Sequence, residues 1–177
     1  DVLGSRGLGD VYKRQIQYLL LIINPTIIFT AYCIATHNIT IGLIEVFSFL
    51  LIRKYCGGYH CQSSTACLIF SVIILIAIAW LSSFIKPSLY MFIALIIADM
   101  ELIIKGPVIS VNHSVSDSEK KYYHRCLIGI LAVFNIIIIT ATASNLYRTA
   151  SCISIVIIFC FISHIACMTE KNRKLYY

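Results

Sequence analysis

The stretch ACLIFSVIILIAIAWLSSFI, residues 66–85, holds 20 consecutive positions without a charged side chain. An α-helix rises about 1.5 Å per residue, so a helix of this length spans about 30 Å, the thickness of the hydrocarbon core of a bilayer. Inside that core the backbone must satisfy its own hydrogen bonds, and a helix does so within a single segment. The stretch therefore predicts a membrane-spanning helix.

Five further apolar runs extend this pattern along the chain. The sequence is 59% hydrophobic and 12% charged, with a mean hydropathy of +0.88, which is typical of a membrane protein rather than a soluble domain. The run 39–52 is the shortest, and its 14 residues reach only about 21 Å, so whether it crosses completely stays open. We predict an all-α, polytopic integral membrane protein with about six apolar helical segments, at residues 16–35, 39–52, 66–85, 88–104, 126–144 and 151–168.

The basic residues predict the orientation of these segments. If all six cross the bilayer, twelve of the fourteen Lys and Arg residues fall on one side, and only Lys86 and Arg148 fall on the other. Cytoplasmic loops carry an excess of Lys and Arg. We therefore expect both termini and the segment 53–64 to be cytoplasmic. The twelve are Arg6, Lys13, Arg14, Arg53, Lys54, Lys105, Lys120, Lys121, Arg125, Lys171, Arg173 and Lys174.

Composition also sets the domain organisation. Residues 1–15 hold three glycines and no long apolar run, so we expect a non-native or disordered segment there, followed by a single membrane domain over residues 16–177. Most of the eight cysteines lie inside apolar runs, where a thiol behaves as a small hydrophobe, and we expect them to be reduced. The net charge of +6 is scattered between the runs, which argues against a nucleic-acid partner.

Three carboxylates lie within or near the ends of apolar runs. Glu45 is surrounded in sequence by apolar or small residues, so it should face the bundle interior and find a partner, and Arg53 is the nearest candidate. Asp99 and Glu101 fall near the end of their run, beside Lys105. A carboxylate costs less free energy there than at the bilayer centre, so we interpret these two as interface anchors.

Polar and nucleophilic residues converge in one stretch, RKYCGGYHCQSSTAC, residues 53–67. His60 and Cys67 are seven residues apart, which on one helix would separate them by about 10.5 Å along the axis. An imidazole must come within hydrogen-bonding reach of a thiol to take its proton. We therefore expect His60 on a loop that folds back towards Cys67 near the start of the next helix, where unpaired backbone N–H groups could also form an oxyanion hole.

By spacing alone this stretch leaves other interpretations open. Two adjacent glycines end a helix readily, and they either form a simple turn or let an extended substrate backbone approach. A zinc site is a second alternative, although the stretch lacks a paired CxxC spacing. A third is a non-enzymatic peptide exporter, with the intramembrane Glu45 and Asn135 lining a path. The residues that would hold zinc are Cys56, His60, Cys61 and Cys67.

The pattern from Arg53 through Gly57-Gly58-Tyr59-His60 to Cys67 resembles the signature of the accessory gene regulator protein B family, AgrB, of Gram-positive quorum sensing. The likeness extends to the hydrophobic segmentation over roughly residues 20–170, and to two stretches of the loop after residue 105. These stretches are Gly106-Pro107-Val108 and Ser118-Glu119-Lys120-Lys121. Two positions depart from the family pattern, because Cys61 follows the histidine where alanine is usual, and Ile109 stands where an acidic residue is expected.

The resemblance implies a membrane cysteine endopeptidase that cleaves a small AgrD-like propeptide and promotes its cyclisation to a thiolactone or lactone signal. Matched by position, His60 and Cys67 correspond to the catalytic pair, and Arg53, Gly57 and Gly58 to substrate-binding positions around it. No cofactor or metal is expected, and a homodimer follows from the resemblance alone.

The loop cations carry a separate hypothesis. Their simplest interpretation is a solvated loop on the positive side of the membrane. As a less favoured alternative, Lys120 and Lys121 would receive an acidic tail of the propeptide.

Overall fold

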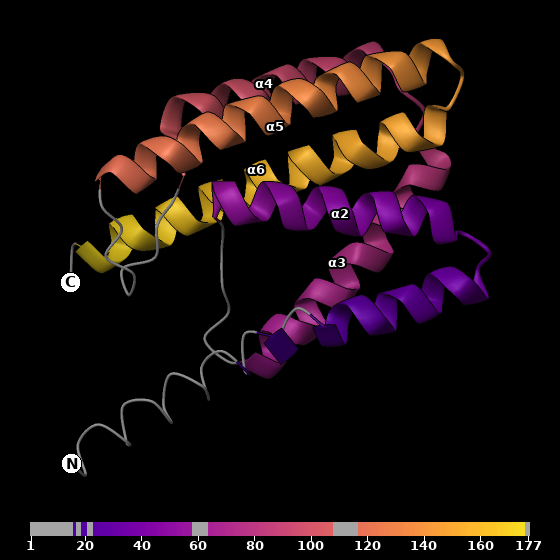
Figure 1. Ribbon diagram of the computed structural model, residues 1–177, viewed down its shortest axis with the longest axis horizontal. Helices are drawn as coiled ribbons and strands as arrows, with labels where there is room; N and C mark the ends of the chain where they lie inside the picture. The colour runs from indigo at the N-terminus through magenta and orange to yellow at the C-terminus, as the bar shows by residue number, and fades with distance from the viewer. Residues whose placement is uncertain (1–15, 17–18, 21–22, 58–63, 108–116, 176–177) are drawn as a thin grey trace.

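The structure is a computed structural model that describes residues 16, 19–20, 23–57, 64–107 and 117–175. Regular structure within these ranges is entirely helical, which confirms the all-α class (Figure 1). The expectation for residues 1–15 lies outside the described residues. The helix Ile23–Ala35 is followed by α2 (Ile39–Cys56), α3 (Ser64–Phe84), α4 (Leu89–Lys105), α5 (Asp117–Ala143) and α6 (Tyr147–Leu175).

Three of these helices are long and apolar enough to cross a membrane, as judged by length and composition over the described residues. They cover Ala66–Phe84, Ser118–Ala143 and Tyr147–Thr169. The shortest predicted segment is longer than its apolar run, because α2 has 18 residues and reaches Cys56, or about 27 Å. The helices and their apolar surfaces make this a multi-pass membrane protein.

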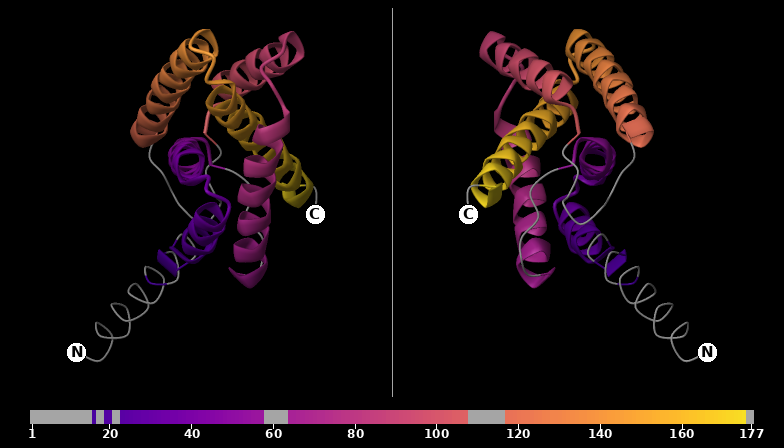
Figure 2. Two further views of the ribbon diagram at one scale, coloured as in Figure 1. Left: turned by 90° about the vertical axis from the view of Figure 1, so that its right-hand side faces the viewer. Right: turned by 90° about the vertical axis from the view of Figure 1, so that its left-hand side faces the viewer.

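Helix α6 is the centre of the bundle. It contacts α2, α3, α4 and α5, and Figure 2 shows its first half between the other helices. The residues of its first turns, from Ala150 through Ser154, are buried and mostly small, so neighbouring backbones can approach closely. Helices α2 and α6 run in the same direction, and their starts are tied by a hydrogen bond of 2.6 Å from the Arg148 guanidinium to the Asn38 amide oxygen.

Two tight turns of the same kind close one end of the bundle. His37 and Asn145 both have positive φ, of 54° and 60°. In each turn the last backbone N–H groups donate back to the preceding helix, as in a Schellman motif. Asn38 N–H donates to Cys33 O at 2.8 Å, and Leu146 N–H donates to Ala141 O at 2.8 Å. We call this the turn end, and the end where α2, α4 and α6 finish and α5 begins the motif end.

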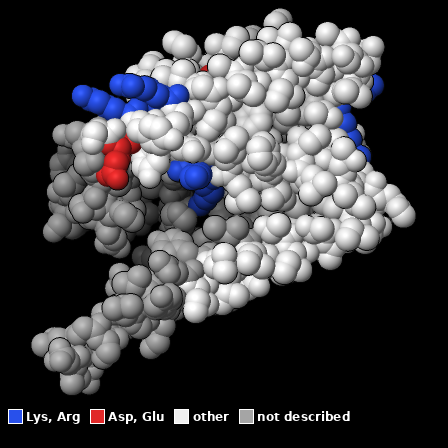
Figure 3. Space-filling view, viewed as in Figure 1, with Lys and Arg blue, Asp and Glu red and all other residues white. Residues whose placement is uncertain are grey.

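The surface fits a bilayer. Many large apolar side chains are exposed along every helix, as expected where lipid rather than water is the solvent. In Figure 3, charged atoms lie towards the two ends of the molecule, with a wide uncharged surface between them.

The buried carboxyl group of Glu45 corrects one expectation. Glu45 is 0% exposed, so it faces the bundle interior as predicted. The predicted partner is wrong, because neither carboxylate oxygen has a hydrogen-bond partner among the described residues. Arg53 lies eight residues further on, about 12 Å along the helix, and its guanidinium stacks 5.6 Å from the centre of the Phe49 ring.

The other two carboxylates do have partners. Asn135 donates to Asp99 at 2.8 Å and also to Leu131 O at 2.9 Å. Lys105 forms a salt bridge of 2.8 Å with Glu101, one helical turn away. These contacts use both hydrogens of the Asn135 amide group, and the interpretation of Asp99 and Glu101 as interface anchors stays a prediction.

Candidate active site

The last turn of α2 carries the first residues of the predicted motif. The helix ends at Cys56, and Gly57 follows with φ of 76° and donates its N–H to Arg53 O. This positive φ favours glycine, because a side chain would meet the backbone there. Cys56 is fully buried, so its thiol does not face solvent. The predicted residues Gly58 and His60 lie outside the described residues.

Cys67 is the fourth residue of α3 and is partly exposed. The buried side chains of the described part of α3 begin only at Ile74, so the thiol lies in the half of the helix that does not pack into the core. Figure 2 shows this half on the side of the molecule away from α4 and α5. The Cys67 thiol can therefore be reached in part from outside the bundle.

Most of the other cysteines differ from Cys67 in their surroundings. Cys33, Cys56, Cys152 and Cys160 are buried in the core, and Cys126 and Cys167 are partly exposed within long helices. Within the described ranges, no group of three or more His, Cys, Asp or Glu residues is arranged to hold a metal ion. Cys67 is therefore distinguished by its place at the start of a helix, directly after the motif.

The two predicted substrate-binding lysines also lie at the motif end. Lys120 and Lys121 are exposed in the first turns of α5. Two residues further on, the Tyr123 ring meets the Tyr55 ring of α2 at 5.9 Å in an edge-to-face arrangement, which is a favourable aromatic geometry. The structure thus brings the start of α5 together with the last turn of α2, which carries Arg53 and Gly57.

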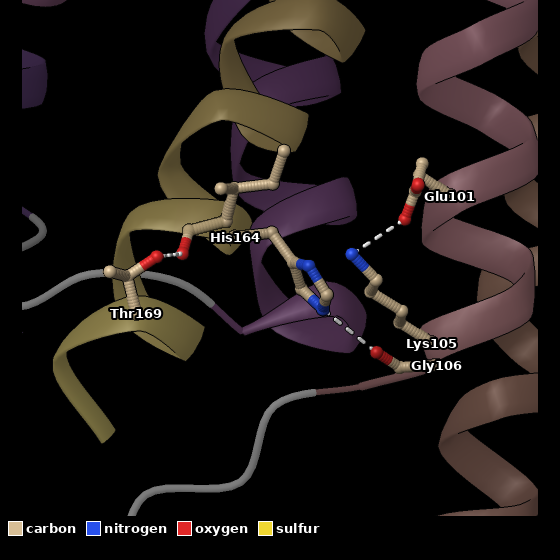
Figure 4. A network of polar contacts seen from close by, with 6 residues as sticks. Glu101, Lys105, Gly106, His164 and Thr169 are labelled. Atoms are coloured by element: carbon tan, nitrogen blue, oxygen red, sulfur yellow. Dashed lines mark hydrogen bonds and ion pairs between the residues drawn. The ribbon is translucent and has the colours of Figure 1, made fainter. Parts of the chain in front are cut away.

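Two histidines at the motif end were not singled out from the sequence. His124 of α5 and His164 of α6 each bind a carbonyl at the end of α4, with Nε2 at 2.8 Å from Ile103 O and at 2.9 Å from Gly106 O, respectively. Figure 4 shows the His164 imidazole reaching from α6 to Gly106, beside the Glu101–Lys105 pair. For His164 the sequence did hold a signal, because its imidazole lies within the apolar run 151–168, where an ionisable group suggests function by default.

Together these features define a class, a multi-pass helical membrane protein with an accessible thiol at the start of a helix that follows a glycine turn. The family model of Accessory gene regulator B, AgrB, matches residues 9–169, and the chain belongs to this family. Neither a curated protein nor a solved structure matches the chain. Family membership assigns the chain a role in the processing of autoinducing peptides.

Proposed function

We propose that this protein is a cysteine endopeptidase that cleaves a small AgrD-like propeptide through a thioester and promotes its cyclisation to a thiolactone or lactone. The observation that carries the proposal is the Cys67 thiol, which is partly exposed at the start of α3 and directly follows the motif. A thiol serves this chemistry because its thiolate is a strong nucleophile at neutral pH.

The proposed reaction uses two residues. His60 takes the proton of Cys67, and the sulfur attacks the carbonyl carbon of the scissile peptide bond. The C–N bond then breaks, the leaving amine receives the proton from His60, and the propeptide remains as a thioester on Cys67. A propeptide thiol attacks this thioester, which forms the ring thioester and returns the proton and the free thiol to the enzyme. A propeptide hydroxyl would give a lactone instead.

Water competes with the ring-closing thiol for the same thioester. A site at the membrane interface restricts the access of water, so the acyl-enzyme survives long enough to close the ring. By the positive-inside rule, the motif end and both termini would be cytoplasmic. The exposed Lys120 and Lys121 and the nearby end of α2, with Arg53, Gly57 and Gly58, would then hold the propeptide on that side.

A second candidate function is peptide export without catalysis. It is favoured by Glu45, which is fully buried and has no hydrogen-bond partner for either oxygen among the described residues, because ionisable groups inside a membrane often mark a transport path. Asn135, the other residue proposed for such a path, is instead bonded to Asp99 and to its own helix. The peptidase is therefore the better-supported function.

One co-expression experiment tests both functions. The chain is produced with the propeptide encoded beside its gene, and cleavage is followed in the wild type and in the His60→Ala, Cys67→Ala, Cys126→Ala and Cys56→Ala/Cys61→Ala variants. The peptidase predicts loss of cleavage in the first two variants only. Cys126 is the matched control because it is also a partly exposed thiol. Cleavage that survives Cys67→Ala would refute the peptidase, and a loss in the double variant as large as that in Cys67→Ala would indicate a metal site.

A further inference from the structure

The end of α4 is held by groups from two other helices. The last carbonyls of a helix have no partner within the helix and need one from elsewhere. His164 supplies the partner of Gly106 O, and His124 supplies that of Ile103 O. Gly106 has φ of 66° and donates its N–H to Leu102 O, and both Gly106 and Pro107 are buried. The direction in which the chain leaves α4 is therefore fixed by contacts rather than by solvent.

His164 also belongs to the contact between α6 and α2. Cys160, His164 and Cys167 follow one another at intervals of four and three residues, which places them on one face of the helix. Cys160 of this face and Cys56, the last residue of α2, are both buried in the hydrophobic core, where α6 packs on α2. The helix face that carries His164 is therefore the face packed on the end of α2, while the imidazole itself binds the end of α4.

The chemistry of this imidazole is unusual for a purely structural residue. His164 is 0% exposed. A carbonyl oxygen only accepts hydrogen bonds, so Nε2 carries the hydrogen and Nδ1 is left as an acceptor. That Nδ1 is buried without a hydrogen-bond partner among the described residues. An incompletely satisfied polar group in a core is costly, and such sites are expected where function requires them.

We propose that His164 is a positioning residue of the peptidase reaction, which holds the Gly106 turn of α4 in register with the last turn of α2. The inference rests on the proposed function. The end of α2 carries Arg53, and its Tyr55 meets Tyr123 of α5, the helix that follows the Gly106 turn in the chain. Misalignment of a bound peptide lowers the rate of attack more than it weakens binding.

The test measures kcat and KM of the purified full-length protein in lipid nanodiscs. The substrate is a synthetic peptide with the sequence of the propeptide encoded beside the gene of this protein. His164→Leu removes the donor and should lower kcat about tenfold, with KM changed less than twofold. His164→Gln keeps an N–H donor and should recover most of kcat. His124→Leu is the matched control, because it removes an equally short bond to the end of α4 but leaves the link from α4 through α6 to α2 in place, and its kcat should change less than twofold.

A second variant keeps the test informative if His164→Leu does not fold. Gly106→Ala strains the same turn without touching α6, because alanine disfavours a φ of 66°, and it should lower kcat in the same way. If His164 acts through Gly106, the His164→Leu/Gly106→Ala variant should have a kcat no lower than that of the slower single variant. The proposal would be overturned if the losses of kcat in the two single variants multiplied in the double variant. Equal losses of kcat in His164→Leu and His124→Leu, or no recovery of kcat in His164→Gln, would also overturn it.

These results separate this inference from the function on which it rests. Wild-type cleavage that depends on Cys67 but is unaffected by His164→Leu would remove only the positioning role. Absence of Cys67-dependent cleavage in the wild type would remove both.

Discussion

The two ends of the helix bundle are built differently. At the turn end the helices are joined by residues 36–38, 85–88 and 144–146, whereas at the motif end the connections run over residues 57–63 and 106–116. Each end also has a partly buried arginine, Arg148 at the turn end and Arg53 at the motif end. Short closed turns fix how helices pack, while longer connections carry function. From the proposed function we therefore expect one end to determine stability and the other to carry the chemistry.

Replacing each of the two arginines by methionine should give the largest difference between the two ends. Arg53→Met should lower kcat/KM for the propeptide about a hundredfold, the size expected for one lost charged contact. Arg148→Met loses the bond to Asn38 and should lower the free energy of unfolding by about 1 kcal/mol, with activity per folded molecule unchanged. Kinetics and thermal unfolding in nanodiscs measure the two effects. The assignment of the ends fails if Arg148→Met is the variant that loses activity.

A packing change at the turn end should affect stability alone. A Cβ added to Gly42 would come within 2.3 Å of the Cys33 sulfur, so close that the sulfur or the two helices must shift. Gly42→Ala should therefore destabilise the protein by about 1–3 kcal/mol. The compensating Cys33→Ala/Gly42→Ala variant removes the sulfur and should regain more than half of that loss. A double variant as unstable as Gly42→Ala would show that the close approach is not what fixes this packing.

The exposed lysines at the motif end predict a smaller effect that depends on salt. If Lys120 and Lys121 attract an acidic part of the propeptide, reversing both to glutamate should raise KM about tenfold at low ionic strength. Added salt should then weaken binding by the wild type and improve binding by the variant, because it screens attraction in one and repulsion in the other. KM values that respond to salt in the same direction in both proteins would contradict this role.

The smallest effect on cleavage is expected at Glu45. Glu45→Leu removes a buried carboxyl group that has no hydrogen-bond partner among the described residues, so it should keep cleavage within about twofold and leave stability unchanged or raised by about 1–3 kcal/mol. Accumulation of cleaved peptide inside cells, with none in the medium, would instead favour the export function. Peptide inside and outside the cells is measured by mass spectrometry.

The helices could be predicted from the sequence because long apolar runs have few alternatives in a bilayer. Their ends were less predictable. Helix α5 begins at Asp117, nine residues before its apolar run, because the polar residues 117–125 form helical turns beyond that run. The end of α2 at Cys56 was predictable, by contrast, because two adjacent glycines follow it in the sequence. Hydrophobicity locates the membrane core of a helix, and caps and glycines decide where the helix stops.

The residues of the candidate site could be proposed from the sequence, whereas the contacts between them could not. Arg53, Gly57 and Cys67 were proposed from spacing and resemblance and stay predicted site residues, and the structure places Gly57 where a positive φ is needed. The bonds from His124 and His164 to α4 were not predictable, because they join positions 21 and 58 residues apart in sequence. No local pattern in one sequence indicates which carbonyl a distant imidazole will reach. The predicted approach of His60 to Cys67 stays a prediction.

The central place of α6 has a consequence for biosynthesis. Helices α2 to α5 are all synthesised before α6, yet each of them packs against it. A nascent chain therefore inserts its earlier helices without the surface that unites them, and the bundle closes only when the segment from Tyr147 onward enters the membrane. Translation must therefore continue past Tyr147 before this packing can form, so a ribosome that stalls earlier releases helices that lack their common partner.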